Sequence, residues 1–102
     1  MSFTVKFSRL AEEDIDSIIH FIARDSPSQA LKFVDELEKR AVQTLEVFPR
    51  SGSTYKNVRY LPFDRYLVVY DIDETDSVVN ILLVTEGQRQ WREIISKRSD
   101  SY

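Results

Sequence analysis

Residues 3–7 alternate apolar and polar side chains with period two, which predicts a short strand that turns its three apolar side chains toward the core. The period then becomes helical, because isoleucines recur between residues 15 and 22 at spacings of three and four. They indicate one buried face of a first helix. We expect this helix to be capped by Ser8 and to end near Asp25.

A second helix is predicted to follow almost at once. Ser26 precedes Pro27 and stands three residues before Gln29, which is the pattern of a capping box with proline at the first helical position. Apolar residues then continue the helical period as far as Phe48, and Pro49 ends it. The two helices should form a helical hairpin with a very short connection.

The pattern becomes extended beyond the second helix. We expect residues 50–57 to form a polar loop, and three strands to follow at 58–61, 65–73 and 77–85. The short polar segments between these strands are typical of tight turns, so the strands should form an antiparallel meander.

The last part of the chain predicts a short helix at 90–97, and residues 98–102 are expected to fray. The predicted fold class is therefore α+β: an N-terminal strand, a helical hairpin, a three-stranded antiparallel meander and a short C-terminal helix. We expect the helical hairpin to pack on one face of the small sheet.

Composition limits the chemistry that is available. At 102 residues the chain can bury one core, so a single domain over 1–102 is expected. It contains no cysteine and one histidine, which excludes disulfides, thiolate metal sites and cysteine nucleophiles. We therefore expect no cofactor and no metal. No apolar run is long enough to cross a bilayer and the N-terminus lacks a secretory pattern, so a cytoplasmic protein without membrane contact is expected.

A formal net charge of -3 hides a local separation of charge. Basic side chains gather in two segments, whereas acidic side chains gather at the predicted turn near residues 71–76. The first basic segment carries Arg50, Lys56, Arg59 and Arg65, and the second carries Arg89, Arg92, Lys97 and Arg98. An acidic chain gains no long-range attraction to nucleic acid, so these segments would act as local patches or simply as solvated faces.

Several motifs follow one another in a familiar order. Ala11 and Asp14 open the first helix with an Ala-x-x-Asp pattern. The others are Phe-Pro-Arg-Ser-Gly at 48–52, Val-Arg-Tyr-Leu at 58–61, Tyr-Leu-Val-Val-Tyr at 66–70 and Gly-Gln-Arg-Gln-Trp at 87–91. Over nearly the whole chain this order resembles the RelE/ParE family of bacterial toxins. The resemblance implies the toxin half of a toxin–antitoxin pair, inhibited by a cognate antitoxin that docks as a helix or an added strand.

One class of this family consists of ribosome-dependent endoribonucleases. As the resemblance implies, their basic and tyrosine side chains drive the messenger RNA 2′-hydroxyl onto the adjacent phosphate without a metal. The candidates for such a site here are Lys56, Arg59, Arg65 and Arg89, with Tyr60 or Tyr66 as the phenol. Only Arg89 falls in a matching position, because Pro62 stands where those nucleases carry a strand-edge arginine and Ile95 lies near the place of their late tyrosine.

The other class blocks DNA gyrase by protein contact, and this chain resembles it better because that class lacks the nuclease residues. Exposed aromatic and arginine side chains are the usual anchors of such an interface. The predicted target-binding residues are Tyr55, Arg59, Arg89, Trp91 and Arg92. Two of them have structural alternatives, since Trp91 could close the core and Arg59 could pair with a neighbouring strand. An inactive interaction domain of the same fold is a third hypothesis.

Overall fold

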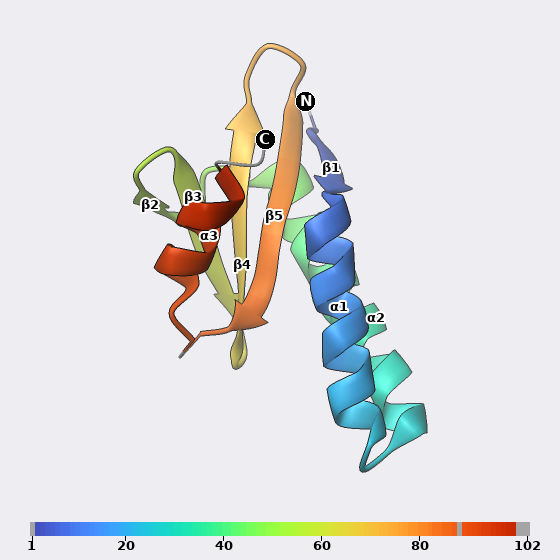
Figure 1. Cartoon of the computed structure of the whole chain (residues 1–102). Coiled ribbons are helices and arrows are strands. Elements are labelled where there is room, and N and C mark those ends of the chain that lie inside the picture. Colours follow the sequence, from blue (N-terminus) through green and yellow to red (C-terminus); the bar gives the residue numbers. More distant parts are fainter. Residues whose placement is uncertain (1, 88, 100–102) are drawn as a thin grey trace.

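The structure is a computed structural model that describes residues 2–87 and 89–99. Within these residues, five strands and three helices follow one another in the order β1-α1-α2-β2-β3-β4-β5-α3 (Figure 1). The strands are β1 Thr4–Phe7, β2 Ser53–Tyr55, β3 Val58–Phe63, β4 Tyr66–Asp73 and β5 Val78–Glu86. The helices are α1 Arg9–Ala23, α2 Pro27–Val47 and α3 Trp91–Ser99. This is the predicted α+β class.

The strands form one open sheet in the order β1-β5-β4-β3-β2. The predicted meander is confirmed, since β3 pairs antiparallel with β4 and β4 pairs antiparallel with β5. The N-terminal strand joins the same sheet, where Thr4 to Phe7 pair in parallel with Val78 to Ile81. Because β4 and β5 are the inner strands, their side chains are buried on both faces, as their continuous apolar runs indicate.

Part of the predicted loop at 50–57 is a strand. Residues 53–55 form β2, in which Ser53 lies opposite Tyr60 and Tyr55 lies opposite Val58. The prediction was wrong here because a strand of three residues is too short to show an alternating pattern. Lys56 has a φ of 52°, and this left-handed conformation closes the two-residue turn between β2 and β3.

The turn between β3 and β4 also lies later than expected. It was predicted at residues 62–64, but β3 continues to Phe63, which pairs with Tyr66. The turn consists of Asp64 and Arg65, and Asp64 has a φ of 58°. Aspartate tolerates that left-handed region better than most residues, so the local sequence accounts for the tight turn. We call the end of the sheet that contains this turn and the last residues of β5 the foot.

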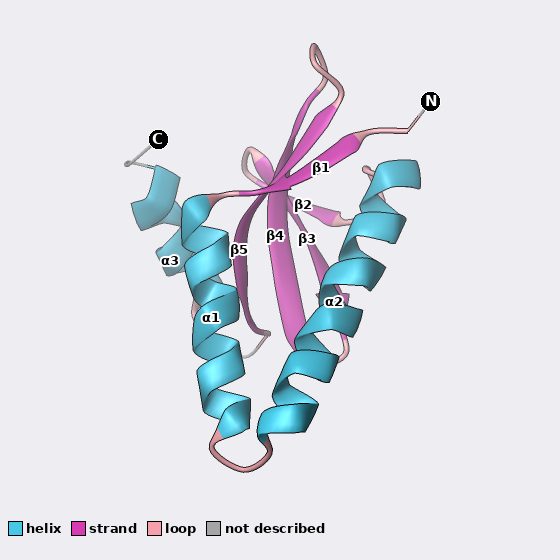
Figure 2. Cartoon of the chain, turned by 90° about the vertical axis from the view of Figure 1, so that its right-hand side faces the viewer, coloured by secondary structure: helices cyan, strands magenta, loops and turns pink. Residues whose placement is uncertain are grey.

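The helices divide between the two faces of the sheet (Figure 2). α1 and α2 cover one face, with α1 beside β5, and α3 lies across the other face.

Side chains of β4 alternate accordingly: Tyr66, Val68 and Tyr70 pack under the helical hairpin, whereas Leu67 and Val69 pack under α3. The core under the hairpin also contains Ile15, Val34, Leu37 and Leu45, and the core under α3 contains Val58, Leu83, Trp91 and Ile95.

The two predicted helix caps have different outcomes. The Ser8 hydroxyl accepts a hydrogen bond from the backbone of Ala11 at 3.1 Å, as expected. Ser26 stands at the N-cap of α2 with Pro27 after it, but its side chain makes no capping hydrogen bond. Its backbone N–H donates instead to the carbonyl of Ile22 at 3.0 Å, so that N–H is already engaged in ending α1. The connection is too short for a full capping box.

Among the described residues, none of the helices combines the length and apolar character required to cross a membrane.

Candidate functional site

Four side chains form a compact group on the α3 face, which we call the aromatic cluster: Tyr55, Tyr60, Trp91 and Arg92. The Trp91 ring lies 4.8 Å from the ring of Tyr60 and 5.3 Å from that of Tyr55. The Arg92 guanidinium stacks over all three rings, 4.4 Å from the centroid of Trp91. Stacked arginine and aromatic side chains are typical anchors of protein interfaces.

Local structure brings the aromatic cluster together. Tyr55 and Tyr60 project from the two strands of the β2–β3 hairpin, and Trp91 opens α3. Trp91 is only 4% exposed, so it does close the core under α3, while Arg92 beside it is exposed. The Lys56 ammonium lies 5.5 Å from the Tyr55 ring and adds a second cation at the tip of the hairpin.

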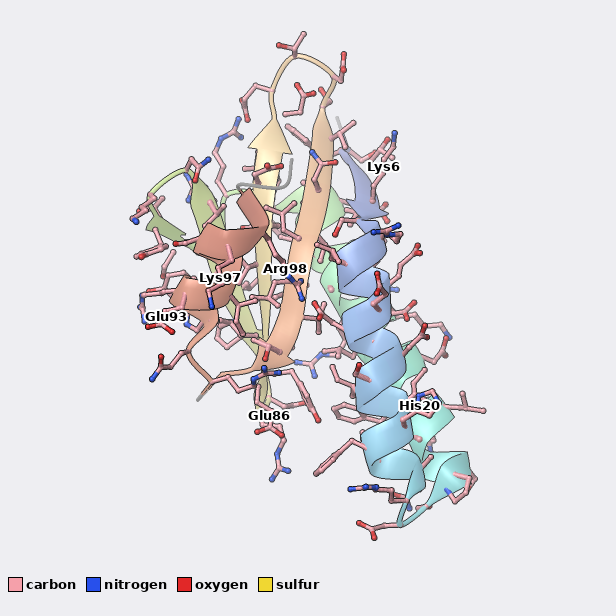
Figure 3. All side chains as sticks on the ribbon, viewed as in Figure 1. Lys6, His20, Glu86, Glu93, Lys97 and Arg98 are labelled. Carbon is pink, nitrogen blue, oxygen red and sulfur yellow. The ribbon has the colours of Figure 1, made fainter. Side chains whose placement is uncertain are left out.

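A groove of about 770 Å³ runs beside this cluster. Two of its lining residues are lysines from opposite edges of the sheet: Lys6, labelled in Figure 3, comes from β1, and Lys56 comes from the β2–β3 hairpin. Its lining includes apolar side chains from three elements, Val58, Leu82 and Ile95, and an Asn80–Asp71 hydrogen bond of 3.0 Å. We call it the lysine groove. Its lining thus combines apolar side chains with two lysines and the Asp71 carboxylate.

Arg59, predicted to bind the target, faces away from the aromatic cluster. Its guanidinium donates to the carbonyl oxygens of Arg50 at 3.2 Å and Gly52 at 2.9 Å. The same loop is held by Tyr70, whose buried hydroxyl donates to Pro49 and accepts from Gly52. Burial raises the pKa of Tyr70, partly offset by the Gly52 hydrogen bond and by Arg59. The Phe-Pro-Arg-Ser-Gly motif therefore forms the loop that follows α2, and the side chains of Arg59 and Tyr70 hold this loop in place.

Arg65 and Arg89 lie at the foot of the sheet. The backbone of Gly87, which follows β5, donates to the carbonyl of Arg65 at 3.0 Å. Arg89 lines a smaller cavity of about 290 Å³ between α1 and the end of β5, together with Tyr66. Burial and the nearby carboxylate of Glu86 raise the pKa of Tyr66, while Arg65 lowers it. This phenol therefore retains its proton at neutral pH and could donate a proton but not accept one.

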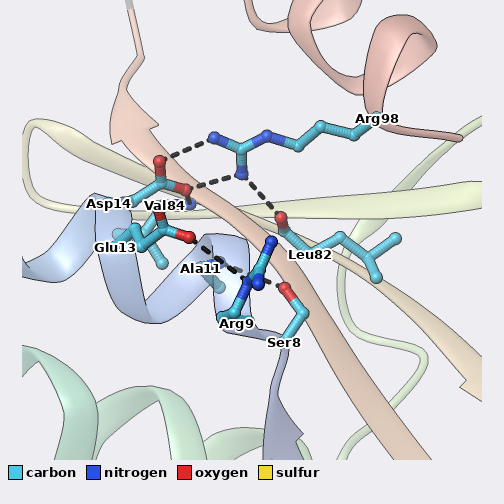
Figure 4. Close-up of polar contacts among 8 residues, drawn as sticks. All are labelled: Ser8, Arg9, Ala11, Glu13, Asp14, Leu82, Val84 and Arg98. Carbon is cyan, nitrogen blue, oxygen red and sulfur yellow. Dashed lines mark hydrogen bonds and ion pairs between the residues drawn. The ribbon is translucent and has the colours of Figure 1, made fainter. Parts of the chain in front are cut away.

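A buried ion pair joins α1 to α3 across the edge of β5, and sequence reasoning missed it (Figure 4). The Arg98 guanidinium and the Asp14 carboxylate make two hydrogen bonds of 2.7 Å, and both side chains are 16% exposed. Asp14 also accepts from the backbone of Val84, and Arg98 donates to the carbonyl of Leu82. The expectation that residue 98 frays was wrong, whereas residues 100–102 lie outside the described residues.

The basic segments are therefore partly neutralised within the chain. Arg50 pairs with Glu74, and Arg98 pairs with Asp14. The histidine is exposed, and its Nδ1 lies 2.7 Å from the Asp16 carbonyl. Within residues 2–87 and 89–99, acidic and histidine side chains do not gather into a group that could hold a metal ion.

The family model that describes the ParE toxin of the type II toxin–antitoxin system parDE matches residues 5–91. The chain belongs to the ParE toxin family. This places it within the RelE/ParE superfamily to which the sequence motifs pointed. No curated protein matches the chain in sequence.

Solved structures with the same fold come from this superfamily. A chain of the chromosomal ParDE system from P. aeruginosa is 23% identical with a TM-score of 0.70, covering 83% of this chain and 96% of that chain. A RelBE toxin–antitoxin complex from Mycobacterium tuberculosis is 20% identical with a TM-score of 0.68, covering 84% and 99%. The intact E. coli RelBE complex is 19% identical with a TM-score of 0.59, covering 86% and 100%.

Within this ParE family fold, the predicted site residues fall into three places. Tyr55, Trp91 and Arg92 meet in the aromatic cluster, with Lys56 beside them. Arg59 binds the α2 exit loop on the other side of the sheet. Arg65 and Arg89 lie at the foot. The four cations proposed for a nuclease site are thus spread over both faces and along the length of the sheet.

Proposed function

We propose that this toxin inhibits DNA gyrase by direct protein contact, without cutting nucleic acid. The observation that carries the proposal is the contrast between the dispersed cations and the compact aromatic cluster. A metal-free nuclease needs several cations around one scissile phosphate, because each must stabilise the same developing charge. Lys56, Arg59 and Arg89 stand at three separate places, and Arg59 is engaged by backbone carbonyls.

The aromatic cluster supports contact with a protein. Arg92 presents an exposed guanidinium above three rings, and the underlying Trp91 is fixed in the core. A preorganised arginine loses little side-chain freedom on binding, which favours a strong contact. In this proposal the target contacts include Tyr55, Arg92 and Arg89, while Arg59 shapes the loop behind them.

We further propose that a cognate antitoxin occupies the lysine groove. The related solved structures include ParDE and RelBE systems, each of which contains an antitoxin. The volume of the groove, about 770 Å³, is large enough for a segment rather than for one side chain, and Lys6 and Lys56 favour acidic residues on that segment. Both proposed partners belong to the cytoplasm, so the proposal implies a cytoplasmic protein.

Ribosome-dependent cleavage of messenger RNA is the second candidate. It is favoured by one observation, that Arg89 and the phenol of Tyr66 line the same cavity and Arg65 is close enough to lower the pKa of that phenol. Against it stands the overall charge of -3, which gives no general attraction to RNA.

The deciding experiment follows DNA synthesis and protein synthesis by pulse labelling, minutes after this chain is induced alone. An early fall in DNA synthesis with translation intact supports gyrase inhibition, and early translation arrest supports the nuclease. Purified chain should inhibit supercoiling by gyrase, and Arg92→Ala should weaken that inhibition. Lys97→Ala removes an exposed charge from the same helix and serves as the matched control. No effect on either synthesis would favour the inactive interaction domain.

A further inference from the structure

The smaller cavity lies apart from the aromatic cluster and the lysine groove. It opens between the outer side of α1 and the foot of the sheet, with a volume of about 290 Å³ against about 770 Å³ for the groove. Ser17 and Phe21 line it from α1, one helical turn apart, and Thr85, Glu86 and Arg89 line it from the end of β5. It has room for one or two side chains rather than for a segment of chain.

Among the polar residues that line this cavity, Arg89 can offer its side chain to a partner. Thr85 cannot do so, because it pairs with Leu67, which packs under α3, and its buried hydroxyl therefore lies toward the other face of the sheet. Arg89 is exposed, and its side chain forms no ion pair or hydrogen bond with residues 2–87 or 90–99.

An apolar surface adjoins this arginine. Phe21 is 61% exposed, although it is a large aromatic side chain on an otherwise amphipathic helix. The helical hairpin that carries it extends past the foot of the sheet in both views of the fold (Figures 1 and 2). A bulky folded partner can therefore reach this place, and an exposed phenylalanine beside an unpaired arginine is an anchor of the kind that such partners use.

The charges of the cavity favour a protein over a nucleic acid. Its acidic members are Glu86 at the rim and Asp14, whose carboxylate is bound by Arg98. A polyphosphate backbone would meet one unpaired cation and the Glu86 carboxylate. A single carboxylate next to an apolar side chain fits better, because it can meet Arg89 while its neighbour packs on Phe21.

We propose that this cavity anchors an acidic side chain on the surface of gyrase, with the carboxylate bound by Arg89 and an adjacent apolar side chain packed on Phe21. This inference rests on the proposed function and adds α1 to the target contacts. The cavity suits a single inserted side chain of a folded target, whereas the larger lysine groove suits an antitoxin segment.

The test uses the full chain with Phe21→Ser and Arg89→Gln. The matched controls are Phe48→Ser, which removes a phenylalanine that is 64% exposed at the other end of the hairpin, and Arg9→Gln, which removes an exposed charge from α1 outside the cavity. Inhibition of purified gyrase, growth arrest after induction, antitoxin co-purification and thermal unfolding are measured for each. We expect roughly thirtyfold weaker gyrase inhibition for the two cavity variants, with antitoxin binding and unfolding unchanged and both controls like the wild type.

Three outcomes would overturn the inference: wild-type inhibition by both cavity variants, loss of antitoxin binding in stably folded cavity variants, or binding of a fluorescent single-stranded RNA that Arg89→Gln abolishes. A failure of the proposed function looks different. If the wild type arrests growth without inhibiting gyrase, the choice of gyrase is wrong. If the Phe21→Ser and Arg89→Gln variants then fail to arrest growth, the cavity still anchors a protein target, but a different one. If both variants still arrest growth, the cavity has no role in target binding.

Discussion

The hydroxyl of Tyr70 donates a hydrogen bond of 2.7 Å to the carbonyl oxygen of Pro49, although 21 residues separate them in the sequence. The hydroxyl oxygen of Tyr70 also accepts a hydrogen bond from the backbone N–H of Gly52 at 3.0 Å. One fully buried phenol thus satisfies both ends of the α2 exit loop, and the path of the chain from the helical hairpin into the sheet depends on it.

Tyr70→Phe should therefore destabilise the protein. It leaves a buried carbonyl and a buried N–H without their partner, which costs about 1–3 kcal/mol in the free energy of unfolding. Urea denaturation measures this loss. Tyr55→Phe is the control, because the structure gives that half-exposed hydroxyl no protein partner among the described residues. Equal stability of the two variants would contradict the role given to Tyr70.

Alkaline pH should weaken the fold through its buried phenols. Burial raises the pKa of Tyr66 and Tyr70 above their ordinary value of 10.0. Well below pH 10.0 both are protonated in the folded and unfolded states, so their contribution to stability is constant. Above it the unfolded chain ionises first, and stability falls until the folded phenols ionise too. Denaturation across this range should show a shallower fall for Tyr66→Phe. An equal fall would mean that these phenols are not the cause.

Gly52→Ala should be destabilising for a steric reason. A methyl group there would lie 2.7 Å from the Tyr70 hydroxyl and 2.8 Å from the Tyr60 carbonyl, so the loop or β3 would have to shift. We expect a loss of about 1–3 kcal/mol, measured by thermal unfolding. Gly87→Ala is the internal comparison, because its nearest neighbour, the Arg65 carbonyl, is 3.8 Å away. Similar losses at both glycines would refute the explanation.

Arg98→Met should cost about 1–3 kcal/mol of stability, because it leaves the partly buried Asp14 carboxylate without its counter-ion. Arg9→Met breaks the ion pair between Arg9 and Glu13, whose side chains are 87% and 60% exposed. This loss should lower the free energy of unfolding by less than about 1 kcal/mol. Chemical denaturation of both variants measures the difference. A small loss for Arg98→Met would mean that α3 is held by Trp91 and Ile95 alone.

Charge reversal in the lysine groove should separate antitoxin binding from toxicity. Lys6→Glu places a carboxylate where we propose acidic antitoxin residues and leaves Lys56, which lies beside the aromatic cluster, unchanged, so co-purification should weaken by roughly tenfold. Growth arrest by the toxin alone should persist. Lys32→Glu on the exposed side of α2 is the control for net charge. Unchanged antitoxin binding would remove the groove from the proposal.

Much of this architecture could be predicted because local patterns carry it. The spacing of the isoleucines in α1 and the continuous apolar runs of β4 and β5 predict that these side chains are buried. The Asp14–Arg98 pair could not be found in this way, since 84 residues separate its members and each is individually typical of a surface helix. The candidate site shows the same limit: residues close in sequence, such as Arg59 and Tyr60, point to opposite faces of a strand.

The parallel pairing of β1 with β5 has a consequence for the order in which the protein folds during synthesis. β1 can pair only once residues 78–81 have been synthesised, more than 70 residues after its own, so the sheet closes late. A nascent chain without β5 lacks the inner strand shared by both cores and cannot hold α3 in place. The sheet and both cores can therefore form only after residues 78–86 have been synthesised, and until then β1 has no strand to pair with.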